Sequence, residues 1–301
     1  MTSRVPPYYG RMECSVIIPA FNEAAALRSV LEELVAFLRQ QNIAAQVIVV
    51  DDGSTDRTAD EVRAVPGVQL IRHPYNKGYG AALKTGIRAA TTEWCFTYDA
   101  DRQHTPDLIA LLLPHCTEGN DMVVGKREGY RGPWIRQPGK KLISMVANFV
   151  TERKIPDLNS GLRAFRRSAF LRFMHLFPNG FSLSTTSTVC FFKEGLNVVY
   201  VPIRIRERVG KSTVRPRDFG KTLMLVLRII MLFSPLRIFL PACFFFAFLT
   251  VADVVIQFIL TGDFTNKSTV ALISLTSLTF FFGLLADQIA ALRREHLRQA
   301  S

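Results

Sequence analysis

Apolar and polar positions alternate in blocks up to about Arg217. Short runs rich in Val and Ile are separated by longer segments with helical periodicity. The predicted strands are Cys14–Pro19, Gln46–Val50, Val68–Arg72, Trp94–Tyr98 and Asp121–Val124. The predicted helices are Glu23–Gln41, Asp56–Val65, Tyr79–Ala90 and Pro106–Cys116. This alternation indicates an α/β fold, in which helices cover both faces of a mostly parallel sheet.

The C-terminal part of the chain has a different pattern. Ile238–Leu260 and Val270–Ile289 are apolar, and each is long enough to cross a bilayer, because a spanning helix needs about 20 residues. The short polar link between them predicts a helical hairpin. The alternative is a pair of buried helices in a soluble protein. Asp253, deep in the first segment, marks either a helix–helix contact or a polar position that handles lipid.

Basic residues flank the outer ends of this hairpin. Arg228 and Arg237 precede the first segment, and the loop between the segments offers only Lys267. The arginines that follow the second segment are Arg293, Arg294 and Arg298. The positive-inside rule therefore predicts a multi-pass protein of the cell membrane, with the N-terminal domain and both termini in the cytoplasm.

The change of pattern also predicts a division into domains. Residues 1–217 would form the catalytic domain, 218–236 an amphipathic juxtamembrane helix, and 237–301 the two transmembrane helices with a basic tail. Phe219–Leu236 carries Lys221 and Arg228 among apolar residues, as expected of a helix in the membrane surface. Lys140–Val150 is a shorter candidate of the same kind. An ordinary amphipathic core helix would give either pattern.

Charge narrows the class of partner. The 37 Lys and Arg residues outnumber the 25 Asp and Glu residues, for a net charge of +12 among 301 residues. That excess favours anionic partners such as phosphates, nucleic acid or an acidic membrane leaflet. The five cysteines have no paired metal-ligand spacing, which indicates reduced, structural thiols.

Acidic clusters follow three of the predicted strands. They lie in Pro19–Glu23, Asp51–Asp56 and Asp99–Gln103. If these strands are parallel neighbours, all three clusters arrive at one edge of the sheet, where like charges are costly without a cation or hydrogen-bond donors. Asp99 and Asp101 can share one Mg²⁺, which typically takes one or two carboxylates and fills its other positions with water and phosphate. Each cluster alone has a simpler reading, and Asp56 in particular is expected to cap the helix that follows it.

These motifs resemble family 2 glycosyltransferases of the GT-A fold, which is Rossmann-like. The nearest branch is the polyprenyl-phosphate glycosyltransferases related to dolichyl-phosphate mannose synthase. The matching segments are Val16–Glu23, Val49–Asp56, Asn76–Gly80, Asp99–His104 and Asp157–Gly161. The resemblance covers Cys14 to Pro235, and two membrane helices after the catalytic domain also occur in this branch.

The resemblance implies a nucleotide-sugar donor and a divalent cation. Residues implied in nucleotide-sugar binding are Pro19, Phe21, Asn22, Glu23, Asp51, Asp52, Lys77 and Ala100. Asp99, Asp101 and Gln103 would hold Mg²⁺ or Mn²⁺ against the diphosphate. Asp99 and Asp101, together with Arg127, would be the catalytic residues.

The acceptor implied is a polyprenyl phosphate in the lipid bilayer. Arg127 is the first choice for its phosphate; the others are Lys140, Ser144, Arg206, Arg208 and Lys211. Arg206 and Arg208 compete for one role, because the spacing of that motif departs from the family's. Gly125–Gly139 is expected to be a loop that closes over the acceptor, and Asp157 to orient groups or support the fold. Direct displacement by the phosphate would invert the anomeric centre.

The predicted function is therefore inverting, metal-dependent transfer of a sugar to a polyprenyl phosphate; the alternative is a family 2 enzyme acting on another lipid or glycan. A polysaccharide synthase is disfavoured because Gln-x-x-Arg-Trp is absent. A dinucleotide-binding oxidoreductase would need a third glycine, where this chain has Leu83. A membrane scaffold or nucleic-acid binder would not explain the acidic clusters, so no nucleic-acid partner is expected. Phe181–Ser187 replaces an acid of many relatives, which leaves the sugar open, and a homo-oligomer also stays open.

Overall fold

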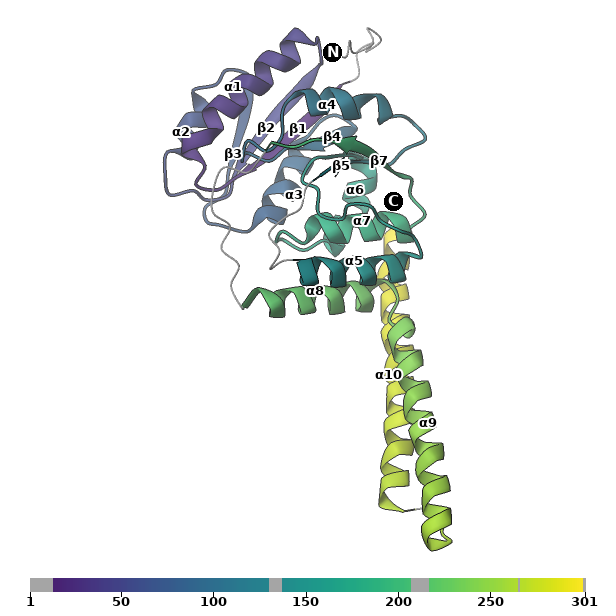
Figure 1. Cartoon of the computed structure of the whole chain (residues 1–301). Coiled ribbons are helices and arrows are strands. Elements are labelled where there is room, and N and C mark those ends of the chain that lie inside the picture. Colours follow the sequence, from purple (N-terminus) through teal and green to yellow (C-terminus); the bar gives the residue numbers. More distant parts are fainter. Residues whose placement is uncertain (1–12, 130–136, 207–216, 265, 300–301) are drawn as a thin grey trace. The chain divides into compact units, whose positions relative to one another are not determined.

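The computed structural model describes residues 13–129, 137–206, 217–264 and 266–299 (Figure 1). The strands are β1 (Cys14–Ala20), β2 (Ala45–Asp51), β3 (Val68–Arg72), β4 (Trp94–Thr97), β5 (Met122–Arg127), β6 (Arg163–Arg166) and β7 (Val198–Ile203). The helices are α1 (Ala24–Gln40), α2 (Thr58–Arg63), α3 (Tyr79–Ala89), α4 (Asp107–Leu112), α5 (Gln137–Thr151), α6 (Arg167–Phe173), α7 (Leu183–Lys193), α8 (Arg217–Phe233), α9 (Leu236–Thr261) and α10 (Lys267–Gln299). Two short 3-10 helices follow α4 and α6.

The strands form one sheet in the order β3-β2-β1-β4-β6-β5-β7. β6 runs antiparallel to β4 and β5, whereas the other neighbouring pairs are parallel. The predicted α/β fold is confirmed, and the five predicted strands are present with small shifts at their ends. The prediction missed β6 and β7. Pro202 lies within β7, where proline argues against a strand except at a sheet edge, and β7 is the edge strand.

The register of the central strands sets the geometry of the site. Ala20 at the end of β1 pairs with Asp51 at the end of β2, and Ile17 pairs with Thr97 at the end of β4. α1 packs its buried stripe, which includes Leu27, Leu31 and Leu34, into the core beside β1. The residues that follow these three strands therefore emerge at one edge of the sheet, as the sequence predicts.

The chain divides into two compact units. One contains residues 1–140 and 153–215, and the other contains 141–152 and 216–301. The first unit holds the sheet, whereas the second contains α8, α9, α10 and most of α5. α8 ends at Phe233, before Pro235, because a proline disfavours helical backbone in the residue that precedes it. The division at residues 217 and 236 inferred from the sequence stays a prediction.

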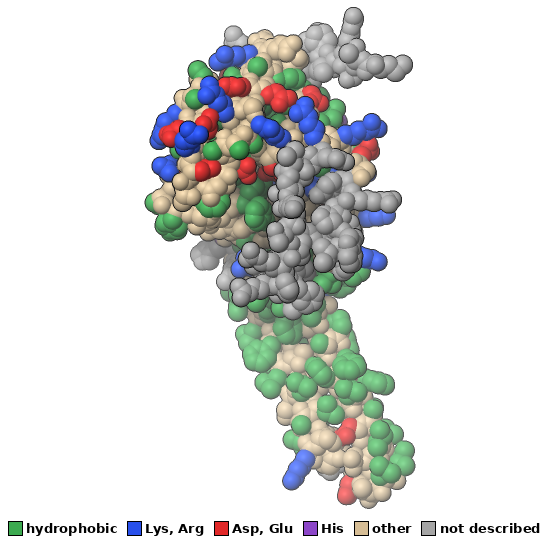
Figure 2. All heavy atoms as spheres, turned by 60° about the vertical axis from the view of Figure 1, so that its left-hand side comes forward, with side chains coloured by type: hydrophobic (Ala, Val, Ile, Leu, Met, Phe, Trp, Pro, Cys, Tyr) green, Lys and Arg blue, Asp and Glu red, His purple; other side chains and the backbone are tan. Residues whose placement is uncertain are grey.

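Helices α9 and α10 form the expected hairpin. Both are long and apolar enough to cross a membrane, and only 0% and 11% of their most apolar windows are buried. The alternative of two buried core helices does not fit that exposure. Figure 2 shows apolar side chains along this pair of helices. Asp253 of α9 accepts hydrogen bonds from the hydroxyls of Ser268 (2.8 Å) and Thr269 (2.6 Å) of α10, so its observed role is a helix–helix contact.

Candidate active site

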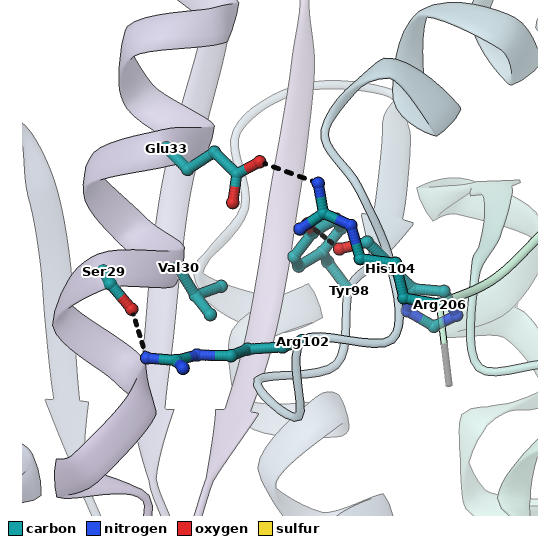
Figure 3. Close-up of a pocket in the computed structure, with 7 residues that line it drawn as sticks. All are labelled: Ser29, Val30, Glu33, Tyr98, Arg102, His104 and Arg206. Carbon is teal, nitrogen blue, oxygen red and sulfur yellow. Dashed lines mark hydrogen bonds and ion pairs between the residues drawn. The ribbon is translucent and has the colours of Figure 1, made fainter. Parts of the chain in front are cut away.

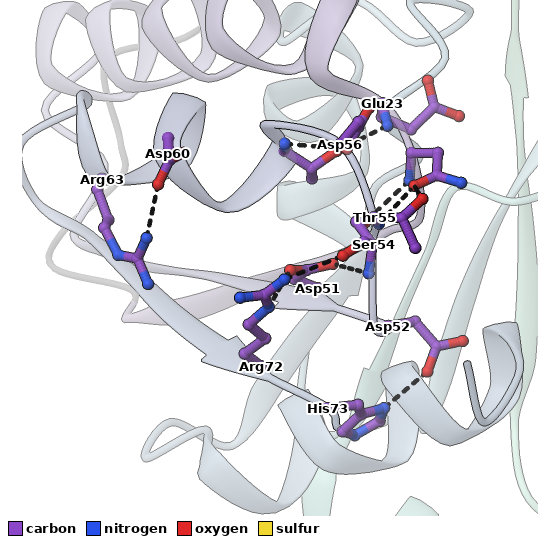
Figure 4. A network of polar contacts seen from close by, with 12 residues as sticks. Glu23, Asp51, Asp52, Ser54, Thr55, Asp56, Asp60, Arg63, Arg72 and His73 are labelled. Atoms are coloured by element: carbon purple, nitrogen blue, oxygen red, sulfur yellow. Dashed lines mark hydrogen bonds and ion pairs between the residues drawn. The ribbon is translucent and has the colours of Figure 1, made fainter. Parts of the chain in front are cut away.

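The loops after β1 and β2 are joined by hydrogen bonds (Figure 4). Asn22, whose φ is +55°, donates its backbone N–H to Ser54 Oγ (2.9 Å) and accepts from the N–H of Thr55 (2.9 Å) through Oδ1. Asparagine tolerates this left-handed conformation better than most residues. The backbone N–H of Glu23 donates to Thr58 Oγ1 (2.9 Å). The first two acidic clusters therefore form one connected surface.

Asp56 lies within the same network. Its carboxylate accepts from the N–H of Thr58, the first residue of α2 (3.0 Å), and from the N–H of Ala24, the first residue of α1 (3.2 Å). These bonds to backbone and to the Thr58 hydroxyl outweigh burial and lower the pKa of Asp56. The expected capping role of Asp56 is confirmed, and it extends to a second helix.

Asp51 is fully buried at the end of β2. Its Oδ1 accepts from the N–H of Ser54 (2.8 Å). Arg72 Nε lies 3.0 Å from Oδ2, as an ion pair outside hydrogen-bond geometry. The role of Asp51 in nucleotide binding stays a prediction, and its observed role is to close the turn after β2.

Both carboxylate oxygens of Asp52 take part in hydrogen bonds within the protein. Oδ1 accepts from His73 Nδ1 (2.7 Å) and the N–H of Lys77 (2.9 Å), and Oδ2 accepts from the N–H of Gly78 (2.8 Å). His73 Nε2 lies 2.9 Å from Thr85 Oγ1. Asp52 thus fixes the turn that precedes α3, a positioning role that the sequence did not suggest. Its predicted contact with the nucleotide stays a prediction.

The third cluster begins with Asp99, just after β4. Tyr79 donates its hydroxyl to Asp99 Oδ1 (2.9 Å). Burial and the charge of Asp99 raise the pKa of Tyr79 well above its ordinary value, so the hydroxyl keeps its proton. A Cβ at Gly161 would lie 2.0 Å from Asp99 Oδ2, so only glycine fits there. The segment 157–161 therefore packs directly against Asp99.

Residues 101–104 complete this loop. Asp101 Oδ1 accepts from the N–H of Gln103 (3.1 Å), and Arg102 turns the chain with φ +61°. Two buried polar atoms, Gln103 Nε2 and His104 Nδ1, have no hydrogen-bond partner. The Gln103 amide N–H group lacks an acceptor, so these orphaned atoms fit a site that a polar substrate completes, and the two neighbouring carboxylates are oxygen ligands of the kind that a divalent cation takes.

His104 is a residue that sequence reasoning placed in a motif but gave no role. It is buried, and burial lowers its pKa against the opposing charges of Asp99 and Asp101, while Arg127 lowers it further. Its neutral ring thus lies within the electrostatic reach of both acids and of Arg127. Within the described residues no three side chains among His, Cys, Asp and Glu form a metal cluster. Two carboxylates with a diphosphate do not require one.

Arg127 is locked to Asp157. Arg127 Nε and Nη2 donate to the two Asp157 carboxylate oxygens, each at 2.8 Å, and only 15% and 12% of the side chains are exposed. Burial would raise the pKa of Asp157, but the hydrogen bonds and charge of Arg127 outweigh it and lower that pKa. Asp157 therefore orients the arginine that was predicted to bind the acceptor.

One expectation about this region is wrong. The predicted loop Gly125–Gly139 begins too early, because Gly125 to Arg127 belong to β5, and α5 already starts at Gln137. The unpredicted β7 supplies the partner: Gly125 pairs with Val201 and Arg127 with Ile203. Residues 130–136 of that loop lie outside the described part of the chain.

Arg163 of β6 ties the 157–161 segment to α7. Its side chain is buried, and its guanidinium donates to the carbonyls of Ser160 (2.7 Å) and Ser184 (2.9 Å) and to the Thr188 hydroxyl (3.0 Å). Desolvation lowers the pKa of Arg163. The residues of the hydroxyl-rich segment from Ser184 onward are buried. Of these, Thr185 donates to Asn159 Oδ1 (2.9 Å).

The remaining predicted residues are scattered. Arg206 lines a pocket of about 290 Å³, 3.5 Å from Glu33 and beside Arg102 and His104 (Figure 3). Ser144 is half-buried on α5, in the second compact unit. Phe21 and Lys77 are exposed, Pro19 is half-buried and Ala100 is buried. Arg208, Lys211 and the side chain of Lys140 lie outside the described residues.

Comparison with known proteins identifies the family of this site. The family model for "Glycosyl transferase family 2" matches residues 15–173, more than half of the chain. The chain belongs to glycosyl transferase family 2. A second model, "GtrB C-terminal hairpin", matches residues 234–292 of this family 2 chain, the segment that contains α9 and most of α10.

Curated relatives and solved structures agree with this assignment. The chain is 29% identical over 263 residues to an undecaprenyl-phosphate 4-deoxy-4-formamido-L-arabinose transferase of Serratia proteamaculans, covering 76% of this chain and 80% of the relative. It is 30% identical to the transferase of the same name from Pectobacterium atrosepticum, and the matched region covers 70% of this chain and 75% of the relative. Glucosyl-3-phosphoglycerate synthase from Mycobacterium tuberculosis, solved with Mn²⁺, UDP and glucosyl-3-phosphoglycerate, has the same fold, with a TM-score of 0.57. The sequence identity is 21%, and the match covers 74% of this chain and 80% of the synthase.

Proposed function

We propose that this family 2 chain transfers a sugar from a nucleotide-sugar to a polyprenyl phosphate, with inversion at the anomeric carbon and with Mg²⁺ or Mn²⁺. The observation that carries the proposal is the meeting of three acidic strand ends at one sheet edge, next to an arginine held by Asp157. The names of the curated relatives, which are undecaprenyl-phosphate sugar transferases, support the acceptor class.

On the donor side, Asp99, Asp101 and Gln103 would hold the cation, which when bound screens the diphosphate and stabilises the departing nucleoside diphosphate. The orphaned Gln103 Nε2 is a hydrogen-bond donor, so it supports a polar substrate beside these carboxylates rather than the cation itself, which Gln103 would bind through Oε1. The Mn²⁺ and UDP in the solved relative are also consistent with it. Tyr79 and Gly161 keep the Asp99 carboxylate in place, so little reorganisation is needed when the donor binds.

On the acceptor side, Arg127 would bind the phosphate. A phosphate monoester has a second pKa of about 6, so it is largely dianionic near neutral pH and needs positioning and charge more than a general base. Asp157 is already paired with Arg127, which supports a role in orientation rather than proton abstraction. A direct attack of the phosphate oxygen on the anomeric carbon would invert that centre.

The hairpin of α9 and α10 would place this site at a membrane. The apolar surface of both helices and the match to the GtrB C-terminal hairpin support membrane attachment. A multi-pass arrangement with both termini in the cytoplasm remains part of the proposal, based on the flanking arginines. Cysteine accessibility at Lys267→Cys tests it, since that position would face away from the cytoplasm.

The direct test is a donor screen with the purified full chain, a short-chain polyprenyl phosphate and Mg²⁺ or Mn²⁺, with detection of the sugar-lipid. We expect a lipid product with one donor, loss of product with EDTA, and loss with Asp101→Asn. Asp60→Asn is the matched control, because Asp60 lies on the exposed surface of α2, where it pairs with Arg63. Transfer that survives EDTA and Asp101→Asn would contradict the metal site. Transfer only to acceptors without a polyprenyl phosphate would contradict the acceptor.

A further inference from the structure

Phe181 is an aromatic ring left open to solvent beside the candidate active site. It precedes α7, and 83% of it is exposed. Its ring stacks on Tyr79, with centroids 5.1 Å apart and planes 20° apart. One face of Phe181 is therefore covered by a protein ring, and its exposed surface is available to a ligand.

The backbone around Phe181 is fixed against the start of α3. Asn179 accepts from the N–H of Ala81 (3.1 Å) through its carbonyl and from Lys84 Nζ (2.9 Å) through Oδ1. A Cβ at Gly80 would lie 2.5 Å from the carbonyl oxygen of Pro178, so glycine is needed for this close approach. The position of the exposed ring is thus set by main-chain packing rather than left to a free loop.

Tyr79 connects this ring to the candidate metal site. Its ring stacks under Phe181, while its hydroxyl donates to Asp99 Oδ1 (2.9 Å). The exposed aromatic surface is therefore one ring away from a carboxylate expected to face the donor diphosphate. The donor diphosphate is joined to the nucleoside on one side and to the sugar on the other, so a surface at this distance lies near one of these two groups.

We propose that the exposed face of Phe181 contacts the sugar ring of the nucleotide-sugar donor, so that Phe181 is a specificity-determining residue. This inference rests on the proposed function. A pyranose has a face of C–H groups, which the negative π face of an aromatic ring attracts, whereas that face repels the anionic phosphate of an acceptor. The neighbouring hydroxyls from Ser184 to Thr188 are buried, which leaves Phe181 as the exposed group of this segment beside Tyr79.

The test compares binding of nucleotide-sugars with binding of their sugar-free nucleotides. Dissociation constants for UDP-glucose, GDP-mannose, UDP and GDP are measured with Mn²⁺ on the full chain in detergent. We expect Phe181→Ala to weaken the nucleotide-sugar that wild type prefers by roughly three- to tenfold. Binding of the matching nucleoside diphosphate should not change, and Phe181→Tyr should restore the lost affinity. Leu111→Ala, which truncates an exposed apolar side chain on α4, is the control and should change neither.

Three results would overturn the inference. One is an equal loss for nucleotide-sugar and nucleoside diphosphate, which would indicate a contact with the nucleoside or a general effect on the fold. Another is a wild-type protein that gains no affinity from the sugar. The third is a change confined to the Michaelis constant of polyprenyl phosphate that grows with tail length, which would assign the ring to the isoprenoid chain. Failure of the proposed acceptor appears separately, as absence of lipid product with wild type, and leaves the binding comparison valid.

Discussion

The pair Arg127–Asp157 permits a prediction with a worked magnitude. Two charge-assisted hydrogen bonds of 2.8 Å join side chains that are 15% and 12% exposed, so removal of one partner leaves a charge largely desolvated. Breaking a buried pair costs about 3–5 kcal/mol, and the residual exposure reduces this to about 2–4 kcal/mol for Asp157→Ala. For a domain of this size that loss lowers the melting temperature by roughly 4–16 °C.

The assay is a double-mutant cycle, which isolates the interaction between the two side chains. Arg127→Ala, Asp157→Ala and the double variant of the full chain are unfolded by heat in the same detergent. We expect a coupling energy of about 1.5–3 kcal/mol, because the double variant leaves no unpaired charge. The exposed pair Arg63–Asp60, with 60% and 68% of the side chains accessible, is the matched control. There the coupling should stay below about 0.5 kcal/mol.

The effect should also depend on pH in one direction. The folded-state pKa of Asp157 is lowered, so the contribution of the pair is complete above the unfolded value of about 3.9 and is lost as the pH falls through the folded value. The stability difference between wild type and Asp157→Ala should thus be constant from pH 7 to about pH 5 and shrink below about pH 4. A coupling no larger than that of the control pair, or a difference that does not shrink in acid, would refute the reasoning.

Three further predictions follow from close contacts. Arg163→Met should lower the unfolding free energy by at least about 2 kcal/mol, measured by thermal unfolding, because buried carbonyls lose their donor; an unchanged melting temperature would contradict this. Gly80→Ala should lower the unfolding free energy by about 2 kcal/mol, and with it the melting temperature by several degrees, whereas Gly119→Ala, whose new methyl group meets open space, should change neither. Equal effects of the two substitutions would contradict the close packing at Gly80. Asp253→Ala should weaken the hairpin by about 1–2 kcal/mol, seen as faster proteolysis at the 261–267 link in detergent, and an unchanged rate would count against the contact.

Much of the fold was predictable because its signals are local. The first five strands are apolar runs that can be recognised in the sequence. The acids that follow β1, β2 and β4 indicated where the candidate site lies, provided that these strands are parallel neighbours. β6 was not predictable by the same means, since this four-residue strand begins and ends with arginine, and the burial of Arg163 depends in part on the carbonyl of Ser184 on α7. The positioning role of Asp52 was not predictable, because its contacts with His73 and with the turn before α3 come from other elements, whereas its contact with the nucleotide stays a prediction. Sequence shows which residues carry charge, whereas long-range packing decides what each charge faces.

The contact between Gly161 and Asp99 has a mechanical consequence. No methyl group fits between them, so the backbone segment that carries Asp157 cannot move closer to Asp99 without displacing the carboxylate that we propose to bind the cation. Asp157, the partner of Arg127, lies four residues before Gly161 in the chain, so the arginine and the Asp99 carboxylate are both positioned by one short backbone segment. A substitution in residues 157–161 that shifts this backbone is therefore expected to disturb both Arg127 and Asp99, even where it touches neither side chain.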